Sequence, residues 1–216
     1  MLTIYGADLS APANKVRMVA NALGLKYAYK RVSLRDGEHK TPEYQKLHPA
    51  SKVPVIDDDG FVLFESGAII RYLADKAGSE LYPTRPQERA IVEQWIDFGT
   101  IHIGGAFSKV IFNRVFAPRI NVPVDENSLS DGLKFLGRFL PVIEEHLCRY
   151  RYLAGERMTL ADINLVALMD PAEIAGIDLS PYPSIVQWRE ALKKQDFYTK
   201  CHRQYGESLQ KLGATK

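Results

Sequence analysis

Residues 52–69 read KVPVIDDDGFVLFESGAI, and they contain the strongest structural signals in the chain. Two short apolar runs, Val53–Ile56 and Phe61–Phe64, flank the polar turn Asp57-Asp58-Asp59-Gly60. An Asp-Gly turn between two such runs is a strong signal for a β-hairpin. Ser66 then begins a helical pattern, because the apolar residues after it recur three and four positions apart. The stretch therefore predicts a hairpin that runs directly into a helix.

The residues before this stretch alternate strand and helix signals. Leu2–Tyr5 is a short run of strand-forming residues, and the apolar residues within 16–23 have helical spacing. Tyr27–Leu34 reads as a second strand, and Thr41-Pro42, an N-cap with a first-turn proline, predicts a short second helix. The order βαβα followed by ββα predicts an α/β domain over residues 1–78, with helices packed on a small sheet.

The chain changes character after a proline-containing linker, residues 79–86. Beyond the linker, residues 87–216 have a helical pattern almost throughout. Residues 129–147 carry an apolar stripe, inside which Pro141 predicts a kink or a local adjustment of the helix. Residues 159–162 have the spacing of a capping box. The sequence thus predicts an α/β domain followed by an all-helical domain.

The composition is that of an ordinary globular protein, with 46% apolar and 25% charged residues. A net charge of +2, without long blocks of either sign, does not indicate a surface that binds nucleic acid or an anionic membrane. The N-terminus lacks the features of a signal peptide, and no apolar run is long enough to span a bilayer. Cys148 and Cys201 are too few for a disulfide scaffold or a zinc site. We expect a cytoplasmic protein that binds no metal, nucleic acid or membrane.

Phosphate loops and the HExxH and GxSxG motifs are absent, so the candidate site rests on four short motifs. The first is Ser10-Ala11-Pro12, between the first strand and the first helix, where helix amides favour an anion. An ordinary N-cap serine fits the same position. Asn14, in the same first turn, is the next candidate donor after Ser10.

The second motif is Lys52-Val53-Pro54-Val55. If the Val53–Pro54 bond is cis, the chain turns sharply and Val53 can present its amide and carbonyl to a peptide-like ligand. A proline is also common at the start of a strand or in an edge strand without any functional role, so both interpretations remain open.

The third and fourth motifs carry charge. At Phe64-Glu65-Ser66, the helix N-terminus could take a carboxylate and Glu65 an ammonium group; a simple capped helix is the alternative. At Gly37-Glu38-His39-Lys40, two cationic donors could bind a carboxylate; a solvated surface loop is the alternative.

Together and in this order, the four motifs resemble those of cytosolic glutathione S-transferases, and the likeness covers nearly the whole chain. The segment from Leu153 to Asp162 resembles the one that marks the family's C-terminal domain. Residues 37–40 and 64–66 are most similar to the phi class, and Ser10-Ala11-Pro12 also resembles the delta and theta classes. Phi sequences commonly have Gln where this chain has Lys52. The resemblance implies an N-terminal thioredoxin-like domain and a C-terminal helical bundle.

The resemblance also implies a role for each motif. Ser10 would donate a hydrogen bond to the glutathione sulfur and hold it as a thiolate. The glutathione-binding residues would be His39, Lys40 and Lys52 at the glycyl carboxylate, Val53 with cis Pro54 at the cysteinyl unit, and Glu65 and Ser66 at the γ-glutamyl end. Glutathione is then a co-substrate, and no cofactor is implied.

Two residue types separate this chain from other relatives. The first turn contains no cysteine, so the chain departs from glutaredoxin-like and omega-class proteins, which form a mixed disulfide. Tyr5 is the only early tyrosine and lies inside the predicted strand, which argues against a tyrosine-type mechanism.

The second substrate is expected beside Ser10 and against the helical domain. The candidate residues are mostly apolar or aromatic: Ala11, Pro12, His102, Phe107, Ile111, Phe112 and Phe116. The same residue types build cores and dimer interfaces, so that alternative stays open for each of them. The apolar content of residues 95–116 favours a homodimer, with the small domain of one subunit against the helical domain of the other.

The implied activity is conjugation of glutathione to hydrophobic electrophiles, as in detoxification. A glutathione-dependent peroxidase, or a specific lyase or dehalogenase, would need the same thiolate, so the sequence does not separate these reactions. A non-catalytic carrier of hydrophobic ligands or an adaptor would be expected to lose Ser10 or the Glu65-Ser66 pair. The chain keeps both, which favours an enzyme.

Overall fold

The computed structural model describes residues 1–202, 205–207 and 209. Its N-terminal elements follow the expected βαβα–ββα order. They are β1 (Leu2–Gly6), α1 (Ala11–Ala22), β2 (Tyr27–Arg31), the 3₁₀ turn η1 (Glu38–Lys40), α2 (Pro42–Leu47), β3 (Val55–Asp58), β4 (Phe61–Phe64) and α3 (Ser66–Lys76). The hairpin and the helix predicted from residues 52–69 are therefore confirmed.

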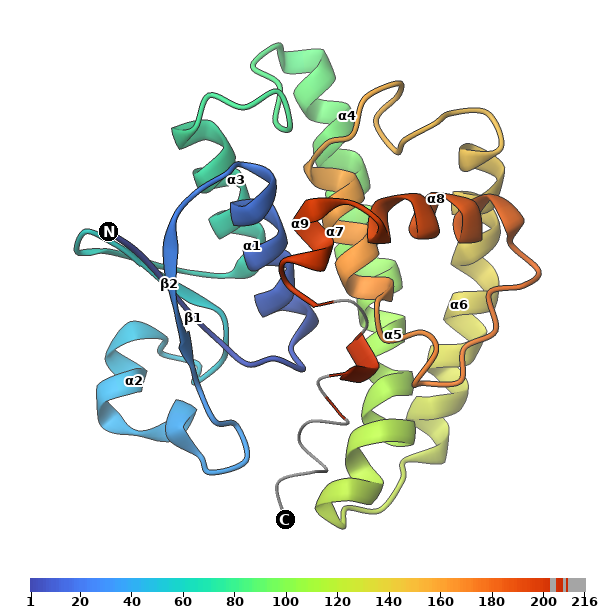
Figure 1. Cartoon of the computed structure of the whole chain (residues 1–216). Helices are drawn as coiled ribbons and strands as arrows, with labels where there is room; N and C mark the ends of the chain where they lie inside the picture. The colour runs from blue at the N-terminus through green and yellow to red at the C-terminus, as the bar shows by residue number, and fades with distance from the viewer. Residues whose placement is uncertain (203–204, 208, 210–216) are drawn as a thin grey trace.

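The four strands form one mixed sheet in the order β2-β1-β3-β4, in which β1 and β2 are parallel and β3 is antiparallel to both its neighbours. One face buries Leu2, Ile4 and Ile56 in the main core with α1 and α3. The other face places Val55 in a smaller cluster with Tyr44 of α2. This alternation follows from the period of two along a strand, and it gives the thioredoxin-like arrangement that the resemblance implied (Figure 1).

Two strands are shorter in the structure than the sequence predicted. β2 ends at Arg31 rather than Leu34, since Val32 donates its last ladder hydrogen bond to the Gly6 carbonyl and the chain then turns. β3 begins at Val55 rather than Val53, because Pro54 has no N–H with which to extend the ladder.

The elements named after α3 in the described chain are all helical. They are α4 (Pro86–Asp97), the π-helical η2 (Phe98–Gly104), α5 (Gly105–Ile111), the π-helical η3 (Phe112–Phe116), the 3₁₀ turn η4 (Ala117–Ile120), α6 (Glu126–Leu147), α7 (Leu160–Met169), α8 (Pro183–Lys193) and α9 (Asp196–Thr199). The stripe along α6 is confirmed at its C-terminal part, where Leu136, Leu140 and Ile143 are buried. The structure assigns α6 as one unbroken α-helix that contains Pro141.

The helix α7 is buried along its whole length and joins the two halves of the molecule. The predicted capping box is confirmed: the side chain of Thr159 accepts from the third helical amide, and Asp162 accepts from the Thr159 N–H at 2.9 Å. On its other side α7 packs against α1, and the buried Lys15 Nζ donates to Asn164 Oδ1 at 2.8 Å. α1 therefore lies between the sheet and the helical half (Figure 1). No helix of the described chain combines the length and the apolar character needed to cross a membrane.

Candidate functional site

The sheet register brings the four motifs to one end of the sheet. Gly6, the last residue of β1, pairs with Arg31, the last residue of β2. Tyr5 pairs with Val55, and Val55 pairs with Phe64, the last residue of β4. At this end of the sheet, the chain leaves β1 toward Ser10 and leaves β2 toward the loop before α2. At the same end it enters β3 from Pro54 and leaves β4 into Glu65. Residues more than fifty positions apart in the sequence share one surface for this reason.

Ser10 is half-buried and is the N-cap of α1. Its backbone is extended, with φ −102° and ψ 105°, and its Oγ accepts from the Ala13 N–H at 3.3 Å. A serine hydroxyl that accepts one hydrogen bond still has its proton to donate. Within the described residues no acceptor takes that proton. The N-cap interpretation is confirmed, and it leaves the hydroxyl free to serve a bound anion.

The loop before Ser10 is held by several side chains. Asn14 Nδ2 donates to the Asp8 carbonyl at 2.8 Å, and the Tyr29 hydroxyl donates to Asp8 Oδ1 at 3.2 Å. The Tyr205 hydroxyl, from the far end of the chain, donates to the Leu9 carbonyl. Asn14 is fully buried, and this contact uses one of its two amide N–H donors.

Lys52, Val53 and Pro54 enter β3 beside β1. The Val53–Pro54 peptide is cis, as predicted. Val53 is half-buried and Pro54 is buried, whereas the Lys52 side chain is exposed. The Lys52 carbonyl accepts from the Tyr44 hydroxyl at 2.9 Å, which fixes this segment to α2.

Glu65 lies between β4 and α3 in an unusual backbone conformation, with φ +69° and ψ 108°. Positive φ is unfavourable for a residue with a side chain and is often retained at functional sites. Glu65 is exposed and makes no capping hydrogen bond with its side chain, so the interpretation as a simple capped helix does not hold for it. The half-buried Ser66 follows as the first residue of α3.

Glu65 also acts on a buried cation. The pKa of Lys15 is lowered to about 8: burial lowers it most, the positive charge of Arg71 acts in the same direction, and the Glu65 carboxylate opposes both. Lys15 is only 1% exposed. Lys15 is not among the residues predicted for the site, although its place four positions before Val19 puts it on the apolar face of the helix.

His39 and Lys40 lie in η1, at the end of the sheet where β2 stops. Lys40 is exposed and His39 is half-buried. The Nδ1 atom of His39 is buried and has no hydrogen-bond partner in the described part of the chain. Buried polar atoms are nearly always paired, so this ring nitrogen is available to a ligand or a water molecule.

The candidates for the second substrate divide into two groups. Ala11 and Pro12 are half-buried beside Ser10, Ile111 and Phe116 are half-buried, and Phe112 is exposed. Phe107 is 2% exposed inside the main core, so the expectation that it lines a pocket is corrected. His102 is corrected as well, because its ring packs against Phe98 and Phe139, at 5.1 and 4.6 Å between centroids, and so faces α6.

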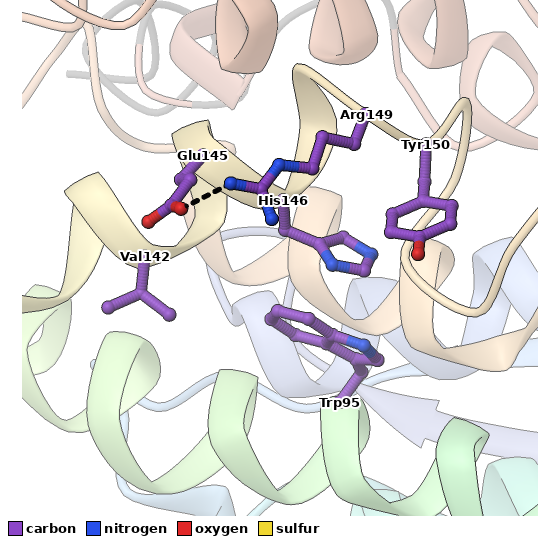
Figure 2. Close-up of a pocket in the computed structure, with 6 residues that line it drawn as sticks. All are labelled: Trp95, Val142, Glu145, His146, Arg149 and Tyr150. Atoms are coloured by element: carbon purple, nitrogen blue, oxygen red, sulfur yellow. Dashed lines mark hydrogen bonds and ion pairs between the residues drawn. The ribbon is translucent and has the colours of Figure 1, made fainter.

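A surface pocket of about 220 Å³ lies away from these motifs, between α4 and the end of α6 (Figure 2). The His146 ring stacks between Trp95 and Tyr150, at 4.4 and 4.7 Å, and Arg149 pairs with Glu145 at 2.7 Å. None of the residues expected to bind glutathione lines this pocket. The part of the chain that the structure describes contains no group of three or more His, Cys, Asp or Glu side chains able to hold a metal ion.

Residues 1–75 match the model of the glutathione S-transferase N-terminal domain, and residues 107–196 match that of the C-terminal domain. A delta-class glutathione transferase from Nilaparvata lugens is 35% identical, with a TM-score of 0.86 over 99% of this chain and 97% of its own. Glutathione transferase F2 from Populus trichocarpa is 29% identical, with a TM-score of 0.87 over 93% of this chain and 97% of its own.

A theta-class glutathione S-transferase from Xanthomonas axonopodis pv. citri, solved with glutathione bound, is 30% identical. It aligns with a TM-score of 0.85 over 92% of this chain and 95% of its own. The two domain models follow one another in the order that the fold shows, and these solved structures are similar to the chain over nearly its full length. The chain therefore belongs to the glutathione S-transferase family of enzymes.

Proposed function

We propose that this protein conjugates glutathione to hydrophobic electrophiles and that Ser10 stabilises the glutathione thiolate. One observation supports this above the others: the sheet register brings a half-buried serine at a helix N-terminus to the same end of the sheet as the other three motifs. The Ser10 proton and the helix amides then act on one bound sulfur atom.

The free energy needed to hold the glutathione thiol as a thiolate at neutral pH is small. A cysteine thiol has a pKa near 8.5, so about 3% of it is ionised at pH 7. Lowering that pKa by two units makes about three-quarters of it thiolate and requires about 2.7 kcal/mol of preferential stabilisation of the anion. A hydroxyl hydrogen bond to an anion, together with a helix N-terminus, can supply this amount. Holding the electrophile beside the thiolate adds to the rate.

Each motif binds one part of the tripeptide in this proposal. His39, Lys40 and Lys52 surround the glycyl carboxylate, and the unpaired Nδ1 of His39 supports that role. The backbone of Val53, before the cis Pro54, pairs with the cysteinyl unit. Glu65 and Ser66 hold the γ-glutamyl end, and the exposed Glu65 carboxylate at the helix entry supports that role.

The electrophile site in this proposal comprises Ala11 and Pro12, next to Ser10, together with Ile111, Phe112 and Phe116. We assign residues 1–78 to the glutathione-binding domain, 79–86 to the linker and 87–216 to the helical domain. Within the last range, residues 203–204, 208 and 210–216 lie outside the described part. We place the enzyme in the cytoplasm in a detoxification role, with glutathione as co-substrate and no further cofactor.

We also propose a homodimer. Residues 95–116 give it less support than their composition indicated, because Trp95, Ile96, Ile103 and Phe107 belong to the core. The support comes from exposed apolar side chains on both halves, among them Phe61 and Phe64 on the edge strand β4 and Ile101 on η2. Light scattering tests it: a mass near twice 24.3 kDa is expected, and the single-chain mass at micromolar concentration contradicts it.

A turnover screen tests the reaction type. Glutathione is offered with aryl halides, isothiocyanates and hydroperoxides in turn, and conjugation of at least one carbon electrophile is expected. Turnover of hydroperoxides alone would establish a peroxidase, and release of halide or ether cleavage for one compound only would establish a dehalogenase or lyase. Binding of the compounds without turnover of any would establish a carrier.

A further inference from the structure

The end of the described chain returns to the start of α1, where Ser10 lies. α9 packs against α1, and Figure 1 shows the described residues that follow α9 in red near the beginning of that helix. Asn21 Nδ2 donates to the Phe197 carbonyl at 3.1 Å, and Arg17 Nη2 reaches the Cys201 carbonyl at 3.4 Å. Tyr205 is 3% exposed, and its hydroxyl donates to the Leu9 carbonyl.

This segment is anchored to the helical half by a buried ion pair. His202 Nε2 contacts Asp170, which directly follows α7, and the Tyr198 hydroxyl donates to the same carboxylate. Burial alone would lower the pKa of His202, but its hydrogen bonds to Asp170 and Cys201 and the charge of Asp170 raise it to about 9. The imidazolium form is therefore the main form at neutral pH. The Tyr205 ring packs edge-on against His202, 6.3 Å between centroids.

The Leu9 carbonyl is directly connected to Ser10. The Leu9 C=O and the Ser10 N–H belong to one planar peptide group, so the direction of the carbonyl sets the orientation of the Ser10 backbone. The two preceding carbonyls are held from within the N-terminal half: Ala7 accepts from the Ser10 N–H at 3.0 Å, and Asp8 accepts from Asn14. Tyr205 holds the third carbonyl from the opposite end of the chain.

We propose that Tyr205 is a positioning residue for Ser10, and that its hydrogen bond to the Leu9 carbonyl, anchored by Asp170 and His202, sets the direction in which the Ser10 hydroxyl points. The proposal rests on the thiolate role of Ser10 given above. Tyr205 donates to backbone and not to the reacting atoms, so its effect reaches the sulfur only through the geometry of residues 9 and 10.

The test compares Tyr205→Phe with Tyr82→Phe. Both variants remove one buried tyrosine hydroxyl and keep the ring, and Tyr82 donates to Glu93, in the region of the linker. Two quantities are measured: the apparent pKa of enzyme-bound glutathione, from thiolate absorbance, and amide hydrogen exchange of a peptide covering residues 9–14 without glutathione. Thermal melts confirm that both variants are folded.

Tyr205→Phe is expected to raise the apparent thiol pKa, to lower kcat/KM at pH 6.5 about three- to tenfold, and to leave KM for glutathione within about twofold. Exchange of the 9–14 amides is expected to accelerate in this variant alone. His202→Gln, which keeps the Tyr205 hydroxyl and weakens its anchor, is expected to give a smaller shift in the same direction.

Unchanged thiol pKa and unchanged exchange in Tyr205→Phe would overturn the proposal while leaving the role of Ser10 intact. An equal shift in Tyr82→Phe would overturn it too, because the effect would then be a general loss of stability. If the unmodified enzyme showed no thiolate band at saturating glutathione, the proposed function would fail. The exchange measurement would then still decide whether Tyr205 orders residues 9–14.

Discussion

Val55 of β3 and Phe64 of β4 are cross-strand partners at the end of the hairpin opposite its turn. Pro54, just before β3, and Glu65, just after β4, therefore lie at the same end of the sheet. The pairing of Tyr5 with Val55 brings the end of β1, and hence the loop to Ser10, to that end as well. Backbone register thus determines which motifs meet. A cysteinyl unit paired with Val53 would have the γ-glutamyl-binding residues on one side and Ser10 on the other.

Removing the two basic side chains of η1 should weaken glutathione binding more than it slows turnover. His39→Ala with Lys40→Ala is expected to raise KM for glutathione and to leave kcat nearly unchanged, because contacts remote from the sulfur are equal in ground and transition states. The two contacts together should contribute about 1–3 kcal/mol, less in high salt.

Lys46→Ala is the matched control for this pair, since it removes an exposed cation from the nearby α2 without touching η1. Steady-state kinetics at two salt concentrations give the comparison. A normal KM with a collapsed kcat in the double variant would place η1 at the sulfur end of the substrate and contradict the assignment.

Substitutions at Glu65 test glutathione binding and the stability of the fold separately. Glu65→Gly should keep or raise the melting temperature, because glycine accepts φ +69° without the penalty of about 1–3 kcal/mol that a side chain carries there. The same variant should raise KM for glutathione, since it removes the carboxylate that we propose pairs with the γ-glutamyl ammonium. Glu65→Gln, which removes only the charge, should raise KM without the gain in stability. Unchanged glutathione binding in both variants would exclude Glu65 from the site.

The sequence predicted the features that local patterns determine and failed where distant residues decide. The hairpin at Asp59-Gly60 and the capping box at Thr159 are written in consecutive residues, and both are confirmed. Phe107 and Phe112 are alike in the sequence, yet one is core and the other exposed, because helix packing decides which face is covered. The proposed roles of the four motifs came from the family resemblance, because no local pattern contains them.

The contact between Tyr205 and Leu9 lies beyond any local pattern, because 196 positions separate the two residues. Only the assembled fold shows that the end of the described chain holds the loop before Ser10.

The His202–Asp170 pair predicts a pH-dependent stability. The pKa of His202 is raised to about 9 in the folded state from 6.5 in the unfolded state. Its stabilising contribution is therefore complete below about pH 6.5 and is lost as the pH rises to about 9. Denaturant unfolding should show that the free energy of unfolding is lower at pH 9 than at pH 6.5. In His202→Gln this decrease should be about 1–3 kcal/mol smaller than in the unmodified protein.

Comparing that decrease between the two proteins isolates His202, because Lys15, with its pKa lowered to about 8, acts in the opposite direction above pH 8 in both. An identical decrease in the variant and the unmodified protein would show that the pair does not titrate as described.

The pH–rate profile of Ser10→Ala tests whether Ser10 stabilises the glutathione thiolate. The variant should fold, because Ser10 caps α1 with one hydrogen bond and such a cap contributes about 1 kcal/mol. Asp125→Ala, which removes the cap that accepts from the Ser128 N–H at the start of α6, controls for the loss of a cap far from the site. Ser10→Thr, which keeps a hydroxyl, should retain more activity than Ser10→Ala.

We expect Ser10→Ala to bind glutathione within a few-fold of the unmodified enzyme and to lose about ten- to a thousandfold in conjugation rate at neutral pH. Raising the pH should restore part of that rate, with the apparent pKa of the profile displaced upward toward the 8.5 of a free thiol. A Ser10→Ala enzyme with full rate and an unshifted profile would show that Ser10 only caps α1 and does not stabilise the thiolate.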